Sequence, residues 1–190
     1  MVLVATLHSS VSDRFDVPVL KTDRFTMRPL RRSDTQALFD TFSNAEDMRF
    51  LTHPPFDTEE ALWHWLTEPG WEGRTWIATD SRGKVVGRFV ACPTDREDIE
   101  EIGFVTVRGR RNKGVARECM SYLIAYLFDE EAKFSVIAEV DVENRTSISL
   151  LEQMRFERTN FRPRKEQTHA GERDVINYVL MASTTTAYHQ

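Results

Sequence analysis

The sequence predicts an α/β protein of the α+β type, in which a mixed, mostly antiparallel sheet of about seven strands is covered by about four helices. Three β-rich segments follow one another directly before a basic, glycine-containing turn, which is typical of antiparallel strands. The order strand–helix–strand after that turn is typical of a parallel pair. With 190 residues, the chain is long enough for one domain with a substantial core. The expected order of elements is β-α-α-β-β-β-α-β-α-β-β.

We expect one domain at residues 21–182, preceded by an arm at 1–20 and followed by a tail at 183–190. Strands are predicted where β-rich residues predominate, at 24–30, 74–79, 84–91, 100–107, 134–140, 156–161 and 174–181. The polar segment that joins the last two strands, 162–173, is predicted to be a loop.

Two helices are expected between the first two strands. Each begins at a capping box, in which a polar residue is followed three residues later by Glu or Gln: Ser33 with Gln36, and Asp57 with Glu60. The segment between them, 44–55, is predicted to be irregular because it ends in His-Pro-Pro. A third helix follows the basic turn, with an apolar stripe at Val115, Cys119, Tyr122, Leu123, Tyr126 and Leu127. A fourth begins at Asn144.

Composition excludes several functional classes. A net charge of −5 argues against a dedicated nucleic-acid-binding protein, and no apolar run is long enough to span a membrane. Cys92 and Cys119 fit a reducing compartment, and we expect a cytoplasmic protein. The histidines have no metal-ligand spacing, so no metal site is predicted.

The central turn, Arg108-Gly-Arg-Arg-Asn-Lys-Gly-Val-Ala116, joins a predicted strand to a predicted helix. This arrangement presents helix N-terminal amides and cationic side chains to a phosphate, so we interpret it as a pyrophosphate-binding turn. A solvated basic turn is the plain alternative. A nucleotide-triphosphate loop is disfavoured, because Val115 and Ala116 stand where Lys and Ser/Thr would be required.

The segment Arg-Asn-Lys-Gly-Val-Ala matches the pattern Gln/Arg-x-x-Gly-x-Gly/Ala at Arg111, Gly114 and Ala116. With the order of elements, it resembles the GNAT superfamily of acetyl-CoA-dependent N-acetyltransferases over about residues 21–182. Asn112 stands where relatives commonly have a further glycine, and asparagine tolerates a positive φ.

A second motif resembles the branch of this superfamily that contains the ribosomal-protein N-terminal acetyltransferases. Asn144 and Ser147, followed by Phe156, match the pattern Asn-x-x-Ser…Gly-Phe, with Arg155 in place of the glycine. Tyr is common seven residues after the asparagine, where this chain has Leu151.

The resemblance implies a GNAT fold, acetyl-CoA as cofactor and no metal. It also implies a set of residues that bind coenzyme A: Val105, Thr106, Val107, Arg110, Arg111, Asn112, Lys113, Gly114, Val115, Ala116 and Asn144. Asn144 has a second interpretation as a simple helix N-cap.

Acetyl transfer requires that the amine lose a proton and that the leaving thiolate gain one. The resemblance makes Glu101 the expected base, with a pKa raised by burial among apolar neighbours. Glu100 points to the opposite face, and its replacement should change little. Ser147 is the expected acid or thiolate hydrogen-bond donor. Both glutamates could instead be ordinary strand carboxylates, and Ser147 an ordinary first-turn residue.

The expected acceptor is a primary amine, in a cleft formed by Asp47–Pro55, the following helix and segment 162–173. A peptide N-terminus is favoured, because its pKa of ~8 leaves more free amine at neutral pH than a lysine-like amine of ~10.4. Arg162, Arg164 and Lys165 should also repel a polycation. A polyamine or amino sugar, and a catalytically silent acyl-CoA sensor, remain alternatives. The protein is expected to be a monomer or homodimer.

Overall fold

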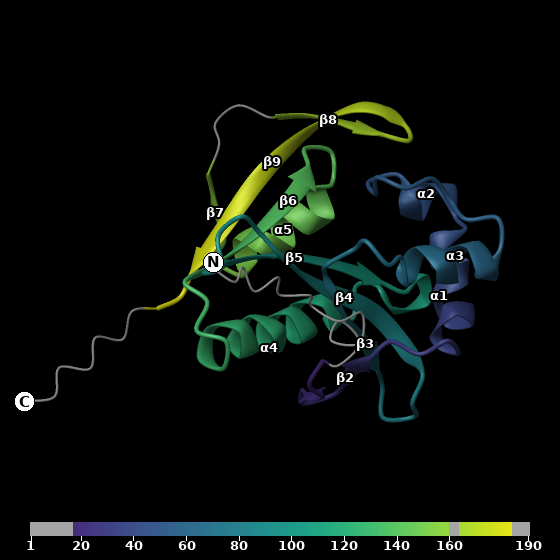
Figure 1. The fold of residues 1–190 in the computed structure, drawn as a ribbon, viewed down its shortest axis with the longest axis horizontal. Coiled ribbons are helices and arrows are strands. Elements are labelled where there is room, and N and C mark those ends of the chain that lie inside the picture. The colour runs from purple at the N-terminus through teal and green to yellow at the C-terminus, as the bar shows by residue number, and fades with distance from the viewer. Residues whose placement is uncertain (1–16, 160–163, 184–190) are drawn as a thin grey trace, which may run out of the picture.

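The computed structural model describes residues 17–159 and 164–183, with the side chain of Arg164 outside the description. Within these ranges the chain forms one nine-stranded sheet in the order β1-β2-β3-β4-β5-β6-β9-β7, with β8 pairing with β9 (Figure 1). The strands are β1 (Leu20–Lys21), β2 (Thr26–Pro29), β3 (Arg74–Thr79), β4 (Val85–Pro93), β5 (Ile99–Thr106), β6 (Ser135–Asp141), β7 (Glu157–Arg158), β8 (Arg164–Thr168) and β9 (Gly171–Met181). The mixed, mostly antiparallel sheet that the sequence predicts is confirmed.

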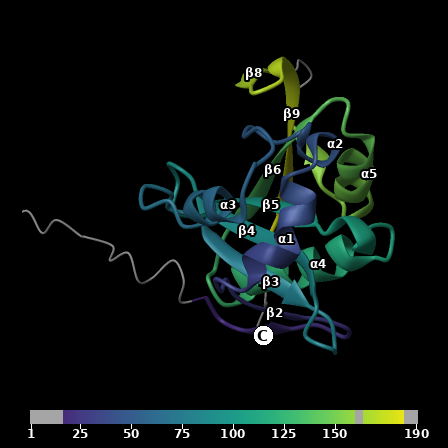
Figure 2. The same ribbon diagram turned by 90° about the vertical axis from the view of Figure 1, so that its right-hand side faces the viewer.

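Helices cover both faces of this sheet. They are α1 (Asp34–Phe42), α2 (Ala45–Met48), α3 (Glu59–Leu66), α4 (Val115–Asp129) and α5 (Arg145–Gln153), with a 3₁₀ turn at Arg108–Arg110. α4 and α5 lie on one face over the larger core, and α1 to α3 lie on the other over a second, smaller core. In Figure 2, α3 lies on the left of the sheet and α4 and α5 lie on its right. No helix in the described ranges is long and apolar enough to cross a membrane.

The parallel pair β5–β6 is paired over only three residues. The register runs Ile99↔Ser135, Glu100↔Val136 and Glu101↔Ile137 and then stops. Both strands nevertheless continue, β5 held by β4 and β6 held by β9. The sheet therefore opens into a fork beyond Glu101, with β5 and β6 diverging from it (Figure 1).

The two helix starts differ from the predicted capping boxes. Ser33 precedes α1 without a side-chain cap, whereas the buried Asp34 accepts hydrogen bonds from the Arg28 guanidinium at 2.7 and 2.8 Å. α3 is capped by Thr58, which accepts from the N–H of Ala61 at 3.1 Å, and not by Asp57. In each case the residue after the predicted cap makes the contact: Asp34 with the Arg28 guanidinium, and Thr58 with the N–H of Ala61.

The connecting segments contain more regular structure than expected. Segment 44–55 includes the short helix α2, capped by Asn44, whose side chain accepts from two backbone amides. Segment 162–173 is not simply a loop, because β8 forms a hairpin with β9. At the tip of this hairpin, the backbone N–H of His169 donates to the carbonyl of Thr52 at 3.3 Å. The hairpin thus reaches across to the segment that follows α2.

Part of the expected N-terminal arm packs on the domain. Val17 is buried, and the indole N–H of Trp76 donates to the carbonyl of Pro18 at 2.9 Å. Leu20 and Lys21 pair with β2. Residues 1–16 lie outside the described residues.

Arg155 replaces the motif glycine and still adopts the glycine conformation. It follows α5 with φ of 67°, and the N–H of Phe156 donates to the carbonyl of Leu151 at 3.0 Å. A non-glycine residue in this region is strained by roughly 1–2 kcal/mol.

Replacing Arg155 by glycine should therefore stabilise the protein. The side chain is exposed, so little is lost with it. We expect Arg155→Gly to raise the free energy of unfolding by roughly 0.5–1 kcal/mol, because glycine relieves the strain but costs more chain entropy. Urea denaturation measures this change. Arg155→Ala is the matched control: it removes the side chain, keeps Cβ and should give no gain. Equal effects of the two substitutions would contradict the strain argument.

Candidate active site

The open end of the fork brings two helix N-termini together. β5 leads through residues 107–114 into α4, and β6 leads through residues 142–144 into α5. Because β5 and β6 are parallel, both helices begin at the same edge of the sheet. Helix N-termini carry unpaired N–H groups and a partial positive charge. This edge is therefore suited to an anionic group.

The turn before α4 has the backbone conformation that close approach of a phosphate requires. Asn112 has φ of 58° and Gly114, at the N-cap of α4, has φ of 75°. The predicted tolerance of Asn112 for a positive φ is confirmed. Gly114 provides no side-chain cap, so the first-turn amides are open to a ligand. The residues fit a pyrophosphate on these grounds.

Two aspartates hold the arginines of this turn. Asp47 of α2 pairs with Arg111 at 2.6 Å and with Arg108 at 3.3 Å, and Asp80 pairs with Arg110 at 3.0 Å. The arginines that the motif groups as phosphate ligands therefore also anchor the turn to the rest of the domain. Sequence analysis missed this role of Asp47, which lies 64 residues from Arg111 in the chain.

The outer side of the turn is tied to the N-terminal strands. Arg24 donates to the carbonyl of Lys113 at 3.0 Å and to the carboxylate of Glu118 at 2.6 Å, and Thr22 donates to Glu118 at 2.6 Å. Burial acts to raise the pKa of Glu118, but the hydrogen bonds from Thr22 and Arg24 outweigh it and lower that pKa. Glu118 therefore stays charged at neutral pH. The Lys113 ammonium donates to the carbonyl of Gly109 at 3.0 Å.

Asn144 and Ser147 lie at the start of α5. Asn144 is the N-cap, and its side chain accepts from the N–H of Ser147 at 3.2 Å. The Ser147 side chain is half-buried, and its hydroxyl has no hydrogen-bond partner among the described residues. Leu151, in the slot where relatives have tyrosine, is buried in the core. Of the two tyrosines expected to be core, Tyr122 instead lies at the surface and donates to Asp23 at 3.0 Å.

Glu101 lies at the closed end of the fork. It belongs to the last residue pair of β5 with β6, and on its other side it pairs with Cys92 of β4. Its side chain is exposed, so the predicted burial is wrong. The physical reason is the fork: the neighbouring strand turns away directly after this position, so the side chain is accessible to solvent.

Glu100 faces the opposite side of the sheet and is buried, with 2% of its surface exposed. It accepts from Arg74 at 2.7 Å and pairs with Lys133 at 3.0 Å. Arg74 also contacts Glu131. Glu100 is therefore a structural residue, and the expected small effect of its replacement on turnover stays a prediction.

Aromatic side chains form a wall on the α1–α3 face of the sheet. The rings of His53 and Phe56 are stacked with centroids 4.0 Å apart, and Trp65 of α3 lies 5.4 Å from Phe56. The tip of the β8–β9 hairpin borders the same region, because His169 contacts Leu51 and Thr52. These elements are the ones from which an acceptor cleft was expected.

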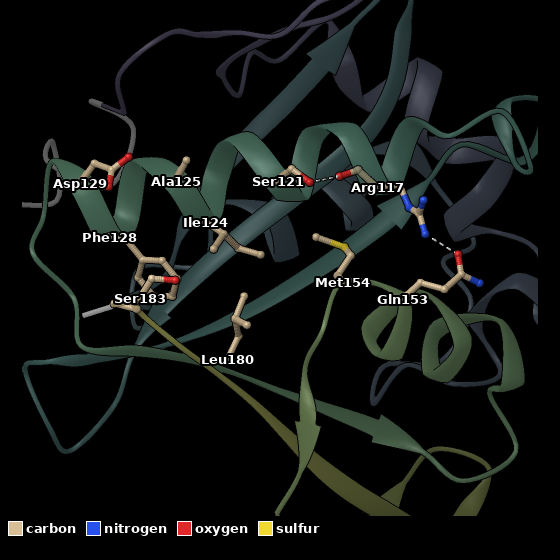
Figure 3. Close-up of a pocket in the computed structure, with 11 residues that line it drawn as sticks. Arg117, Ser121, Ile124, Ala125, Phe128, Asp129, Gln153, Met154, Leu180 and Ser183 are labelled. Carbon is tan, nitrogen blue, oxygen red and sulfur yellow. Dashed lines mark hydrogen bonds between the residues drawn. The ribbon is translucent and has the colours of Figure 1, made fainter. Parts of the chain in front are cut away.

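Two shallow grooves lie on the α4–α5 face. The larger, about 590 Å³, runs between α4 and the ends of α5 and β9, with Phe128 and Leu180 among its walls (Figure 3). Arg117 of α4 contacts Gln153 of α5 at the right-hand end of this groove in Figure 3. A second groove of about 400 Å³ continues from Gln153 along α5 to Arg145. The larger groove reaches the first turn of α4 at Arg117, and the second reaches the first turn of α5 at Arg145 and Thr146. Glu101 lines neither groove.

Within residues 17–159 and 164–183, no group of three or more His, Cys, Asp or Glu side chains could hold a metal ion. The two described cysteines are not thiolates at neutral pH, because burial raises the pKa of Cys92 to about 11 and that of Cys119 to about 12. Neither is suited to act as a nucleophile.

Comparison with known proteins assigns the family. Residues 24–157 match the family model described as an acetyltransferase (GNAT) domain. The chain belongs to the GNAT acetyltransferases. It therefore transfers an acetyl group to an amine, and the cofactor of this family is acetyl-CoA. The match does not separate the branches of the family.

Relatives and solved structures agree with this assignment. The Bacillus subtilis protein YkkB is 28% identical over 142 residues, covering 71% of this chain and 83% of YkkB. The uncharacterized N-acetyltransferase p20 of Bacillus licheniformis is 29% identical over 146 residues, which cover 73% of this chain and 82% of p20. A GNAT-family acetyltransferase from Bacillus anthracis has the same fold, with a TM-score of 0.78 at 22% identity over 86% of this chain and 98% of that one.

One further structural neighbour was solved with ligands. The spermidine N-acetyltransferase of Vibrio cholerae, in complex with CoA and spermine, has a TM-score of 0.70 at 18% identity. It covers 83% of this chain and 95% of that one. At 18% identity this likeness shows a shared fold alone.

Substitution of Glu100 should destabilise the protein. Glu100→Gln would leave Arg74 and Lys133 partly buried without their shared carboxylate. We expect a loss of roughly 3 kcal/mol in the free energy of unfolding, at the low end for a buried pair because both cations keep some contact with solvent. Urea denaturation tests this, with the exposed Glu97→Gln as control. An unchanged midpoint for Glu100→Gln would contradict the structural role.

The conformation of Gly114 should control coenzyme A binding. A Cβ at Gly114 is strained at φ of 75° and would lie 3.0 Å from Arg24 Nη2, so the Arg24 side chain that holds this turn would have to give way. A backbone that relaxes from the strained φ would change the turn that presents the α4 amides. We expect Gly114→Ala to weaken CoA binding by about tenfold in calorimetry. Gly109→Ala is the matched control, because a Cβ there meets no atom within 4 Å. Equal affinities of the two variants would contradict the assignment.

Proposed function

We propose that this GNAT protein acetylates the α-amine of a peptide N-terminus, as do the ribosomal-protein acetyltransferases that its motifs resemble. The observation that carries this proposal is the fork. It has helix N-termini at its open edge and an exposed carboxylate, Glu101, at its closed end.

Binding of coenzyme A is assigned to the α4 side of the fork. The amides of Val115 and Ala116 and the turn Arg110–Gly114 would hold the pyrophosphate. The backbone of Val105–Val107 lies beyond the last β5–β6 pair, so its hydrogen-bonding groups on that side face no described strand and suit the pantetheine arm. Arg117 and Arg145, at the adjoining grooves, are suited to the remaining phosphate. Bound acetyl-CoA would supply the activated acetyl group.

Proton transfer is assigned to residues at the fork. Glu101 is open to solvent and can accept the proton of the incoming ammonium, directly or through a water molecule. Ser147 has an uncommitted hydroxyl that can donate a hydrogen bond to the leaving sulfur, and Asn144 positions it by capping α5. This division places the base on β5 and the acid at the start of α5, the helix that follows β6.

A peptide α-amine suits this site better than a polyamine. Its pKa of ~8 leaves a useful fraction uncharged at neutral pH, so a solvent-exposed carboxylate suffices as base. The open edges of β5 and β6 beyond Glu101 can also pair with an extended backbone. Of the three cations expected to repel a polycation, Lys165 is paired with Asp174 at 2.9 Å and Glu172 at 3.5 Å. Arg162 and the side chain of Arg164 lie outside the described residues.

Replacement of Glu101 tests the base. Glu101→Gln should lower kcat with a short peptide by ~10²–10⁴-fold at pH 7 and leave CoA affinity unchanged. The residual rate should rise with pH as the amine loses its proton unaided. Glu97→Gln is the control at another exposed position. Spermidine at equal concentration is the competing acceptor. A clear preference for spermidine would overturn the peptide assignment, and a Glu101→Gln enzyme with normal turnover would overturn the base.

A further inference from the structure

Arg88 of β4 is a buried cation without an acidic partner. Its residue surface is 8% exposed, and its guanidinium lies 5.1 Å from the ring centre of Trp65 and 5.3 Å from that of Trp71. Nη2 donates to the hydroxyl of Thr75 at 3.2 Å, whereas the buried Nε has no hydrogen-bond partner in the described part of the chain. No carboxylate within those residues lies at ion-pair distance.

Other shielded arginines of this protein are paired. Arg28 binds Asp34 through two hydrogen bonds, and Arg74 binds Glu100 and Glu131. The hydrogen bond with Asp34 raises the pKa of Arg28, whereas burial without a carboxylate lowers the pKa of Arg88 to about 10. An uncompensated buried charge destabilises the fold. The cation–π contacts of the Arg88 guanidinium with Trp65 and Trp71 offset only part of the cost of burying its charge. In the free protein, the Arg88 charge therefore has no counter-charge among the described residues.

Arg88 faces the same side of the sheet as Glu101. Arg88 and Cys92 are four residues apart on β4, with unbroken pairing to β5, and Cys92 is directly opposite Glu101. The pKa of the Cys92 thiol reflects both neighbours: burial raises it most, Glu101 raises it further and Arg88 lowers it. Arg88 and the exposed Glu101 thus both lie near Cys92, on the face of the sheet that α1 to α3 cover. We call this face the acceptor face.

We propose that Arg88 binds a carboxylate of the acceptor, so that the substrate is an amine whose molecule also carries a carboxylate close to the amine. This inference rests on the proposed function and specifies its substrate as a peptide with an acidic first or second residue. A guanidinium binds a carboxylate through two parallel hydrogen bonds, and the unpartnered Nε is one of the donors that such a fork uses. Glu101 would receive the ammonium at the other end of the same residue.

The spacing on the sheet limits where the carboxylate can be. The Cα atoms of Arg88 and Cys92 are separated by about 13 Å along the strand, and the Arg88 side chain covers part of this distance. The carboxylate is therefore expected within the first two residues of the peptide. Trp71, a half-buried indole in the loop between α3 and β3, would have to shift to admit it. A buried cation on the acceptor face also disfavours polyamines, which present only positive charge.

Kinetics with matched peptides tests the substrate class. Two C-terminally amidated peptides that differ only in an N-terminal Glu or Gln isolate the side-chain carboxylate. We expect the wild-type enzyme to prefer the Glu peptide by at least about tenfold in kcat/KM, mainly through KM, as a charge-assisted hydrogen bond provides. Arg88→Met should abolish this preference and keep the rate on the Gln peptide within about threefold. Arg82→Met, at an exposed turn, is the control and should retain the preference.

A binding measurement separates this inference from the proposed function. N-acetylglutamate has carboxylates but no amine, and Trp65 and Trp71 report on Arg88. Titration with N-acetylglutamate should change the tryptophan emission of the wild-type protein and of Arg82→Met, but not that of Arg88→Met. The melting temperature of Arg88→Met should not fall below that of the wild-type protein. Absence of both the fluorescence change and the Glu preference in the wild-type protein would overturn the carboxylate site without recourse to a variant. Free glutamate as a better acceptor than the Glu peptide would support Arg88 and overturn the peptide. Carboxylate binding without acetyl transfer to any amine would overturn the proposed function alone.

Discussion

The site depends on one interruption of hydrogen bonding: β5 and β6 pair over three residues and then part. If β5 and β6 paired along their whole length, the backbone N–H and C=O groups on their facing edges would bond to each other. None of these groups would then be available to a ligand. The interruption leaves two backbone edges open and exposes Glu101 at the point of divergence. It is stable because each strand keeps an antiparallel partner on its other side, β4 for β5 and β9 for β6. The remaining features of the site, the two helix N-termini and the aromatic face, are arranged around this opening.

Charge is distributed asymmetrically around the opening. On the α4 side, the turn arginines are matched by Asp47 and Asp80, so the turn is ordered before a ligand arrives. On the α1–α3 side, Arg88 has no such match among the described residues. Preorganised positive charge lowers the cost of ordering when an anion binds. The turn arginines are paired with aspartates and stabilise the fold. Arg88 has no carboxylate partner among the described residues, so its guanidinium is available to a ligand.

The sequence was sufficient for the architecture and for the main motif. Strand periodicity and the basic turn predict the mixed sheet, the parallel pair and the positive φ of Asn112. It was insufficient where a contact between distant segments decides the outcome. Burial of Glu100 and exposure of Glu101 cannot be read from alternation alone, since they depend on Arg74 and Lys133 and on the divergence of β6. The hairpin β8–β9 was missed because its first strand is polar and lacks the apolar alternation that marks a half-buried strand. Arg88 carried no sequence signal, because an arginine in a strand is ordinary until its partners are known.

The tie between Arg24 and the α4 turn bears on the order in which the chain folds. The hydrogen bonds from Arg24 to Lys113 and Glu118 join residues that are 89 and 94 positions apart. Contacts of such separation form only after the intervening chain has closed into a loop, which slows their formation. The local elements of the turn and α4 can form early, whereas the conformation that presents the α4 amides is completed when the first strands dock. During synthesis the N-terminal strands emerge first and must wait for that docking surface. Competence to bind the cofactor is therefore expected among the last properties that the folding chain acquires.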